Sequence, residues 1–144
     1  LSAFENTGLI FTMPNSDTHG KKIAEMIKNF SKKNKNAIVF NSLGQLRYLS
    51  CIKYVDVVVG NSSSGIAEVP SFKKPTINIG DRQKGRYKFG NVIDVDKGYD
   101  SISSEVKDIF SKSESRDFNY MKFRESIKRN SPTKKIVDLL KDIL

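Results

Sequence analysis

The sequence predicts an α/β fold: a Rossmann-like parallel sheet with helices on both faces. Two observations support this prediction. Short runs that are almost entirely apolar alternate with segments of helical periodicity, which is typical of parallel strands buried on both sides. The loops of unusual composition follow the apolar runs, and ligands of such sheets bind beyond the carboxyl ends of the strands. We therefore expect one domain over residues 1–144, with a binding site at one edge of its sheet.

The first half of the chain predicts two strands and two helices. Residues 9–13 are an apolar run closed by Pro14, and residues 37–40 form a second apolar run, so both are expected to be strands. A polar cap followed by apolar residues on one helical face indicates a helix over residues 17–34. Apolar residues spaced three apart indicate a second helix over residues 44–53.

The second half continues the same alternation. Each apolar run is bounded by glycine, proline or polar residues, which is typical of strand ends. The stretch over residues 111–130 is polar and weakly periodic, and it receives no assignment. The expected strands are residues 55–59, 76–79 and 92–95, and the expected helices are residues 64–72, about 102–110 and 132–144.

The composition excludes several classes of protein. The single cysteine, Cys51, allows no internal disulfide, and the single histidine, His19, allows no multi-histidine zinc site, so no metal and no cofactor are expected. No apolar stretch approaches the ~20 residues of a membrane span and no secretory signal is evident, so we expect no membrane partner and a cytoplasmic location. The chain begins with Leu1 rather than Met, and we expect it to be a fragment of a longer protein.

The net charge of +9 suits binding to nucleic acid, to membrane surfaces or to phosphorylated small molecules. Most lysines surround apolar helical stripes, as solvated surface residues do, and the sequence contains no helix-turn-helix, RNP or zinc-finger pattern. The exception is the loop over residues 80–91, which we call the basic loop. Its cations are Arg82, Lys84, Arg86 and Lys88.

Residues 61–64, which we call the serine loop, are a second candidate anion site. A helix N-terminus presents unpaired N–H groups and a partial positive charge, and small residues let an anion approach them. The hydroxyls of Ser62 and Ser63 add neutral donors. Alternatively, one serine caps the following helix and the others are solvated. From the residues alone, a phosphate cradle and an ordinary connector are equally open.

Further polar residues carry candidate chemistry, each with an alternative. Glu68 lies one helical turn beyond Ser64, where its carboxylate would repel a phosphate but accept the hydroxyl protons of a sugar; an exposed helix glutamate is the alternative. Arg82 and Arg86 suit bidentate phosphate recognition, or they belong to a solvated loop. The polar residues after the first expected strand are ligand contacts or turn and cap residues: Asn15, Asp17 and His19.

The segment GNSSSGIAEVPSFKKPTINIGDRQKGR, from Gly60 to Arg86, resembles the UDP-N-acetylglucosamine 2-epimerase family, especially its hydrolysing, sialic-acid-pathway branch. The match joins GNSS, a glutamate at a fixed distance, PTINIG and DRQ-x-GR in order. PNSDTHG, which begins at Pro14, and shorter motifs extend the resemblance over about residues 9–95. Residues 116–129 depart from the family pattern.

The resemblance implies the nucleotide-binding C-terminal domain of a two-domain enzyme built like a B-type glycosyltransferase, with the N-terminal domain absent. UDP would lie in the cleft between the domains. Carried over by position, Ser62 and Ser63 would hold the diphosphate, with Asn61 beside them, and Glu68 would hold the ribose hydroxyls. Arg82 would hold the phosphates, and Arg86 would order the loop or assist. Phe40 and Ser42 would lie at the uracil.

The family's reaction eliminates UDP to form a glycal and re-adds water on the opposite face at C2, giving N-acetylmannosamine. The acid/base groups implied by the resemblance would precede Leu1, so the catalytic residues are unknown and the fragment is expected to be inactive alone. The full-length protein is expected to be a homo-oligomer that binds UDP-N-acetylglucosamine or UDP and no nucleic acid. Two alternatives stay open: half of a B-type glycosyltransferase or non-hydrolysing epimerase, and a non-catalytic basic module that binds nucleic acid.

Overall fold

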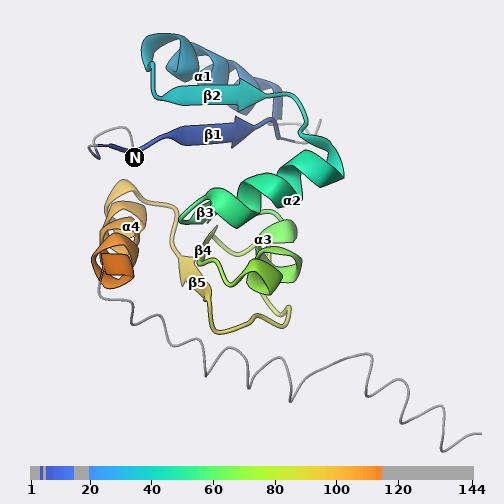
Figure 1. The fold of residues 1–144 in the computed structure, drawn as a ribbon, viewed down its shortest axis with the longest axis vertical. Helices are drawn as coiled ribbons and strands as arrows, with labels where there is room; N and C mark the ends of the chain where they lie inside the picture. Colours follow the sequence, from blue (N-terminus) through green and yellow to red (C-terminus); the bar gives the residue numbers. More distant parts are fainter. Residues whose placement is uncertain (1–3, 5, 15–19, 115–144) are drawn as a thin grey trace, which may run out of the picture. The chain divides into compact units, whose positions relative to one another are not determined.

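The computed structural model of the chain describes residue 4, residues 6–14 and residues 20–114 (Figure 1). These residues belong to two compact units, residues 1–51 and residues 52–144. Within the described part of the chain, no helix combines the length and the apolar character needed to cross a membrane.

The first unit contains two parallel strands and the helix that connects them. β1 (Leu9–Thr12) pairs in parallel with β2 (Ala37–Phe40). α1 (Gly20–Lys33) lies between them in sequence, and its Phe30 meets the ring of Phe11 on β1 edge to face, with centroids 5.7 Å apart. The ring contact shows that Phe30 packs on β1, whereas Ile23 and Met26 of the same helix are exposed. These elements confirm the two predicted strands and the predicted helix between them.

The second unit contains a parallel sheet in the order β3-β4-β5 (Figure 1). Its strands are β3 (Val58–Gly60), β4 (Thr76–Ile79) and β5 (Val92–Val95), and α4 (Tyr99–Glu114) follows β5. The central strand β4 is buried along its first three residues, as expected for a parallel strand covered on both faces. α2 (Gly44–Tyr54) crosses the boundary between the two units in sequence. Among the described residues of the second unit, the buried hydrophobic side chains are those of Ile52, Ile66, Val69, Ile77, Val106 and Ile109.

The predicted helix over residues 64–72 is wrong as a single element. The chain forms the short helix α3 (Ser64–Ala67) and then the 3₁₀ helix η1 (Val69–Phe72). Pro70 explains the break, because proline has no N–H for a helical hydrogen bond and its ring collides with the carbonyl four residues earlier. The helix that follows the serine loop is therefore a single turn.

Two other boundaries differ from the prediction. β3 begins at Val58 rather than at residue 55: the Val58 N–H donates to the Pro75 carbonyl at 3.0 Å, and Pro75 has no N–H with which to continue the ladder. α4 is longer than predicted and includes residues 111–114, which had no assignment. The predicted helix over residues 132–144 lies outside the described residues. The α/β class with parallel strands is confirmed, and the described strands form one sheet in each unit.

Candidate functional site

The serine loop connects β3 to α3 in the second unit. Asn61, Ser62 and Ser63 are exposed. The Ser62 Oγ accepts a hydrogen bond from the Ser64 N–H at 3.4 Å, whereas Ser63 makes no side-chain capping bond. The capping role thus falls to Ser62, and the Ser63 hydroxyl is not used for the cap. Because α3 has only four residues, an anion bound here would depend on loop N–H groups and hydroxyls rather than on a long helix dipole.

A close contact with β4 holds the turn of helix that follows the serine loop. The Thr76 Oγ1 donates a hydrogen bond to the Gly65 carbonyl at 2.8 Å, and both residues are buried. A Cβ added at Gly65 would lie 2.8 Å from the Cγ2 of Thr76. The glycine therefore permits the close approach of α3 to β4. The serine loop lies at the carboxyl end of β3 because it follows that strand directly.

Glu68 lies at the junction of α3 and η1 and is half-buried. Its N–H donates to the Ser64 carbonyl at 2.9 Å, so Glu68 lies one turn beyond Ser64 even though the helix ends there. The contact of its carboxylate with a ribose stays a prediction.

The basic loop leaves β4 through turns that require glycine. Gly80 has φ of 69° and Gly85 has φ of 77°, both in the left-handed region that other residues rarely adopt. Arg82 and Arg86, the two predicted phosphate ligands, lie on this loop and are exposed. The two glycine turns therefore set the course of the loop on which both guanidinium groups are carried.

Gln83 joins the basic loop to the serine loop. Its side chain is 3% exposed although it lies between exposed cations. The Gln83 Nε2 donates to the Asn61 carbonyl at 2.8 Å, and its Oε1 accepts from the Arg86 Nη1 at 2.9 Å. These bonds link Asn61 of the serine loop to Arg86 of the basic loop. No role for Gln83 is predicted from the sequence, in which its only signal is a neutral amide among four cations.

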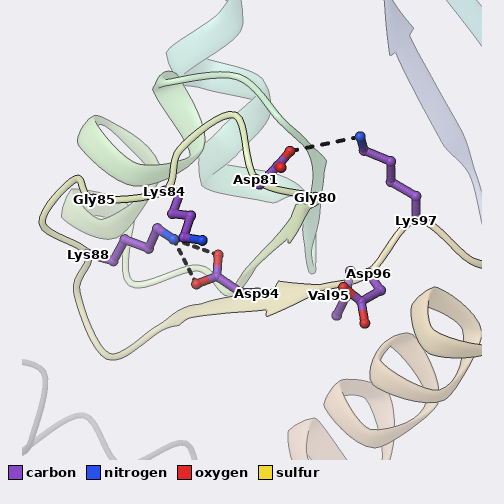
Figure 2. Close-up of a pocket in the computed structure, with 9 residues that line it drawn as sticks. All are labelled: Gly80, Asp81, Lys84, Gly85, Lys88, Asp94, Val95, Asp96 and Lys97. Carbon is purple, nitrogen blue, oxygen red and sulfur yellow. Dashed lines mark hydrogen bonds and ion pairs between the residues drawn. The ribbon is translucent and has the colours of Figure 1, made fainter.

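A pocket of about 730 Å³ lies at the carboxyl ends of β4 and β5 (Figure 2). Lysines and aspartates face each other across it, and the Lys97 Nζ lies 3.8 Å from the Asp81 Oδ1. No residue of the serine loop and neither arginine of the basic loop lines this pocket, so it lies apart from the phosphate ligands predicted from the sequence. The charged residues that line it are Asp81, Lys84, Lys88, Asp94, Asp96 and Lys97.

Asp94 ties the second half of the basic loop to the sheet. The Lys88 Nζ donates to the Asp94 Oδ1 at 2.8 Å and to its Oδ2 at 2.7 Å, as Figure 2 shows. The Asn78 Nδ2, from the middle of β4, donates to the same Oδ1 at 2.7 Å. The bond from Lys88 and then the bond from Asn78 lower the pKa of the Asp94 carboxyl from its ordinary value of 3.8.

Replacing Lys88 with methionine is expected to lower the free energy of unfolding by less than about 1 kcal/mol near neutral pH, because the Asp94 side chain is 55% exposed. A lowered pKa stabilises the fold only while the carboxylate is charged. The difference between Lys88→Met and the unsubstituted chain should therefore be complete above the ordinary Asp pKa and should vanish as the pH falls through the lowered pKa of Asp94. Urea unfolding from about pH 6 to about pH 2.5 measures it.

Lys97→Met is the matched control for this experiment. Lys97 pairs at 3.8 Å with Asp81, and both side chains are largely exposed, so its loss should change stability little at any pH. An equal pH dependence in both variants would contradict the role given to the Lys88–Asp94 pair.

The remaining predicted site residues are not in the second unit. Phe40 ends β2 and is half-buried. Ser42 is exposed, and its Oγ accepts a hydrogen bond from the Gly44 N–H at 3.2 Å at the start of α2, so the structure gives it a capping contact. Asn15, Asp17 and His19 lie outside the described residues.

Parallel strands whose carboxyl ends carry the serine loop, the basic loop and a charged pocket place the chain in the Rossmann-like α/β class. The model of the family described as UDP-N-acetylglucosamine 2-epimerase matches residues 1–141. The chain belongs to this family, and the resemblance inferred from the sequence is confirmed.

Three curated bacterial relatives show the extent of the similarity. The chain is 45% identical over 122 residues to the GDP/UDP-N,N'-diacetylbacillosamine 2-epimerase (hydrolyzing) of Campylobacter jejuni subsp. jejuni, a match that covers 82% of this chain and 29% of the relative. It is 37% identical over 107 residues to the UDP-N,N'-diacetylbacillosamine 2-epimerase (hydrolyzing) of Legionella pneumophila subsp. pneumophila, a match that covers 74% of this chain and 28% of the relative. It is 48% identical over 96 residues to the polysialic acid biosynthesis protein P7 of Escherichia coli, a match that covers 66% of this chain and 24% of the relative. The matches thus span between 24% and 29% of the relatives' length.

Proposed function

We propose that the full-length protein is a hydrolysing UDP-N-acetylglucosamine 2-epimerase and that this chain holds the UDP part of its substrate. The observation that carries the proposal is the hydrogen bond from Gln83 to the Asn61 carbonyl, because it sets a loop of hydroxyl donors beside a loop with two guanidinium groups. Hydroxyl and guanidinium donors together suit the oxygens of a diphosphate. Membership of the epimerase family supports a nucleotide-sugar as the ligand.

The proposal gives each part of UDP its own group of residues. The exposed hydroxyls of Ser62 and Ser63 and the exposed guanidinium of Arg82 bind the diphosphate, while Arg86 orders the loop and assists in binding the phosphates. Glu68 accepts the ribose hydroxyls, because a carboxylate one turn from the phosphates is better placed for a sugar than for an anion. In the first unit, Phe40 and Ser42 are assigned to the uracil on the family resemblance alone.

In the proposed reaction the anomeric C–O bond breaks and its electron pair leaves with UDP, while a base removes the proton at C2 to give a glycal. Water then supplies a hydroxyl at C1 and a proton at C2 from the opposite face. Negative charge develops on the leaving UDP, where Arg82 and the hydroxyls of the serine loop stabilise it. The proton transfers at C2 belong to residues outside this chain, and the enzyme is proposed to act in the cytoplasm as a homo-oligomer.

A second candidate substrate is UDP-N,N'-diacetylbacillosamine. The names of the Campylobacter and Legionella relatives, at 45% and 37% identity, carry this sugar. The UDP part is common to both candidates, so the roles proposed for the serine loop and the basic loop are the same for either sugar.

The 144-residue chain is expected to bind UDP weakly, with a dissociation constant above about 100 μM, and to turn over neither UDP-sugar, because half of a two-domain site lacks closure around its ligand. Calorimetry measures the binding, and chromatography of the incubated UDP-sugars measures the turnover. Generic RNA and DNA are the control ligands: a basic nucleic-acid module would bind them in a strongly salt-dependent way. Absence of UDP binding, or tighter binding of RNA than of UDP at moderate salt, would overturn the proposal.

A further inference from the structure

Gln83 is buried although its neighbours in the basic loop are exposed. It lies in the basic loop between Arg82 and Lys84, both of which are exposed, yet its own side chain is only 3% exposed. A buried polar side chain is stable only when its hydrogen bonds are made, and an amide has both donors and an acceptor to satisfy. Gln83 satisfies them on two different segments of the chain.

The two bonds of Gln83 require an amide and fix its orientation. Its Nε2 donates to a carbonyl, that of Asn61, and its Oε1 accepts from a guanidinium, that of Arg86. The reversed amide would set oxygen against oxygen and NH₂ against guanidinium, so only one orientation is compatible with both partners. A carboxylate would lose the donor and an ammonium would lose the acceptor.

The partners of Gln83 link it to both anion-binding loops. Asn61 directly precedes Ser62 and Ser63, so the bond to its carbonyl fixes the start of the serine loop. Arg86 uses one of its five N–H donors on Gln83 and keeps the others for a ligand. One buried side chain therefore sets the distance between the serine hydroxyls and the guanidinium of Arg86.

We propose that Gln83 is a positioning residue of the UDP site: it holds the serine loop and the Arg86 guanidinium in one arrangement before the ligand arrives. This inference rests on the proposed function, because UDP is the ligand that the two loops would share. Groups that are ordered in advance lose less conformational entropy on binding, so their positioning raises affinity without an added contact. Gln83 itself touches no part of the ligand in this proposal.

Gln83→Met and Gln83→Glu test the role in the complete 144-residue chain. Methionine keeps the length and removes both bonds; glutamate keeps an acceptor for Arg86 but sets a carboxylate oxygen against the Asn61 carbonyl. Either change should lower the affinity for UDP by about fivefold or more and should speed hydrogen exchange of the amides at residues 61–63. Gln45→Met is the matched control, since Gln45 is exposed on α2 and its replacement should change neither quantity.

A double-variant cycle separates positioning from general support of the fold. If Gln83 acts through Arg86, then Gln83→Met should cost less than half as much UDP affinity in the Arg86→Met background as in the unsubstituted chain. Urea unfolding without ligand identifies any variant that fails to fold, and in that case Gln83→Glu and the exchange of residues 61–63 carry the test.

The outcomes distinguish the inference from the proposed function. UDP binding by the unsubstituted chain, with equal affinity in both Gln83 variants, would overturn the inference alone. Losses that add fully in the double variant, or unchanged exchange of residues 61–63, would also overturn it by showing no positioning of the two loops. Failure of the unsubstituted chain to bind UDP would overturn the proposed function, and the inference with it.

Discussion

Replacing Gly65 with alanine is expected to lower the free energy of unfolding by about 1–2 kcal/mol, although alanine normally favours a helix over glycine by about 1 kcal/mol. The new Cβ would lie 2.8 Å from the Cγ2 of Thr76, closer than real side chains approach. Thr76 is 2% exposed and its hydroxyl is bonded to the Gly65 carbonyl, so it has little room to move away. Overpacking therefore outweighs the gain in helix propensity.

Urea unfolding measures the loss, and a second substitution tests its cause. Thr76→Ser removes the Cγ2 and keeps the hydroxyl, so Gly65→Ala should cost less than half as much in the Thr76→Ser background. Gly90→Ala is the matched control, since no atom lies within 4 Å of a Cβ at Gly90. An equal loss at Gly65 in both backgrounds would show that the contact with β4 is not the reason for the glycine.

Replacing both Ser62 and Ser63 with alanine is expected to lower the affinity for UDP by at least about tenfold, because hydrogen bonds to a charged group contribute about 1.5–3 kcal/mol each. The loss should be incomplete, because the backbone N–H groups and Arg82 remain. Calorimetry with UDP and with inorganic pyrophosphate should show a loss of similar size for both ligands, since both carry the diphosphate. A Ser101→Ala variant, changed at an exposed serine of α4, is the control.

Glu68→Gln is expected to change the binding of UDP and of pyrophosphate differently. The amide keeps the size of the side chain and drops its charge, so UDP should bind more weakly through the ribose. Pyrophosphate binding should be unchanged or slightly tighter, because a nearby negative charge is gone. If Glu68→Gln weakened the binding of pyrophosphate as severely as the binding of UDP, Glu68 would support the fold rather than contact the sugar.

Most strands of this chain could be predicted because each is a continuous apolar run closed by a turn residue. β2, β4 and β5 have the predicted boundaries. Two of the errors, those at α3 and β3, occur where a proline interrupts a favourable pattern. Pro70 divides a segment of good helical periodicity into α3 and η1, and Pro75 removes the N–H that would have extended β3.

Some features of the candidate site can be predicted from local sequence, whereas others depend on residues that are distant in the chain. The serine loop and the basic loop are visible in the sequence because their composition is unusual over a few residues. The burial of Gln83 depends on a carbonyl 22 residues earlier in the chain, so no local pattern reveals it. The pocket also depends on distant residues, because Asp81 follows β4 and Lys97 follows β5.

The two bonds of Gln83 also limit how this surface can change during evolution. Exchange for Glu removes the donor to Asn61, exchange for Lys removes the acceptor for Arg86, and Asn is one methylene shorter. Lys84, next in the chain, is exposed and free of such a double requirement. The charge of the basic loop can therefore change at Lys84 without loss of the bonds to Asn61 and Arg86, whereas each of these exchanges at the uncharged, buried Gln83 disturbs them.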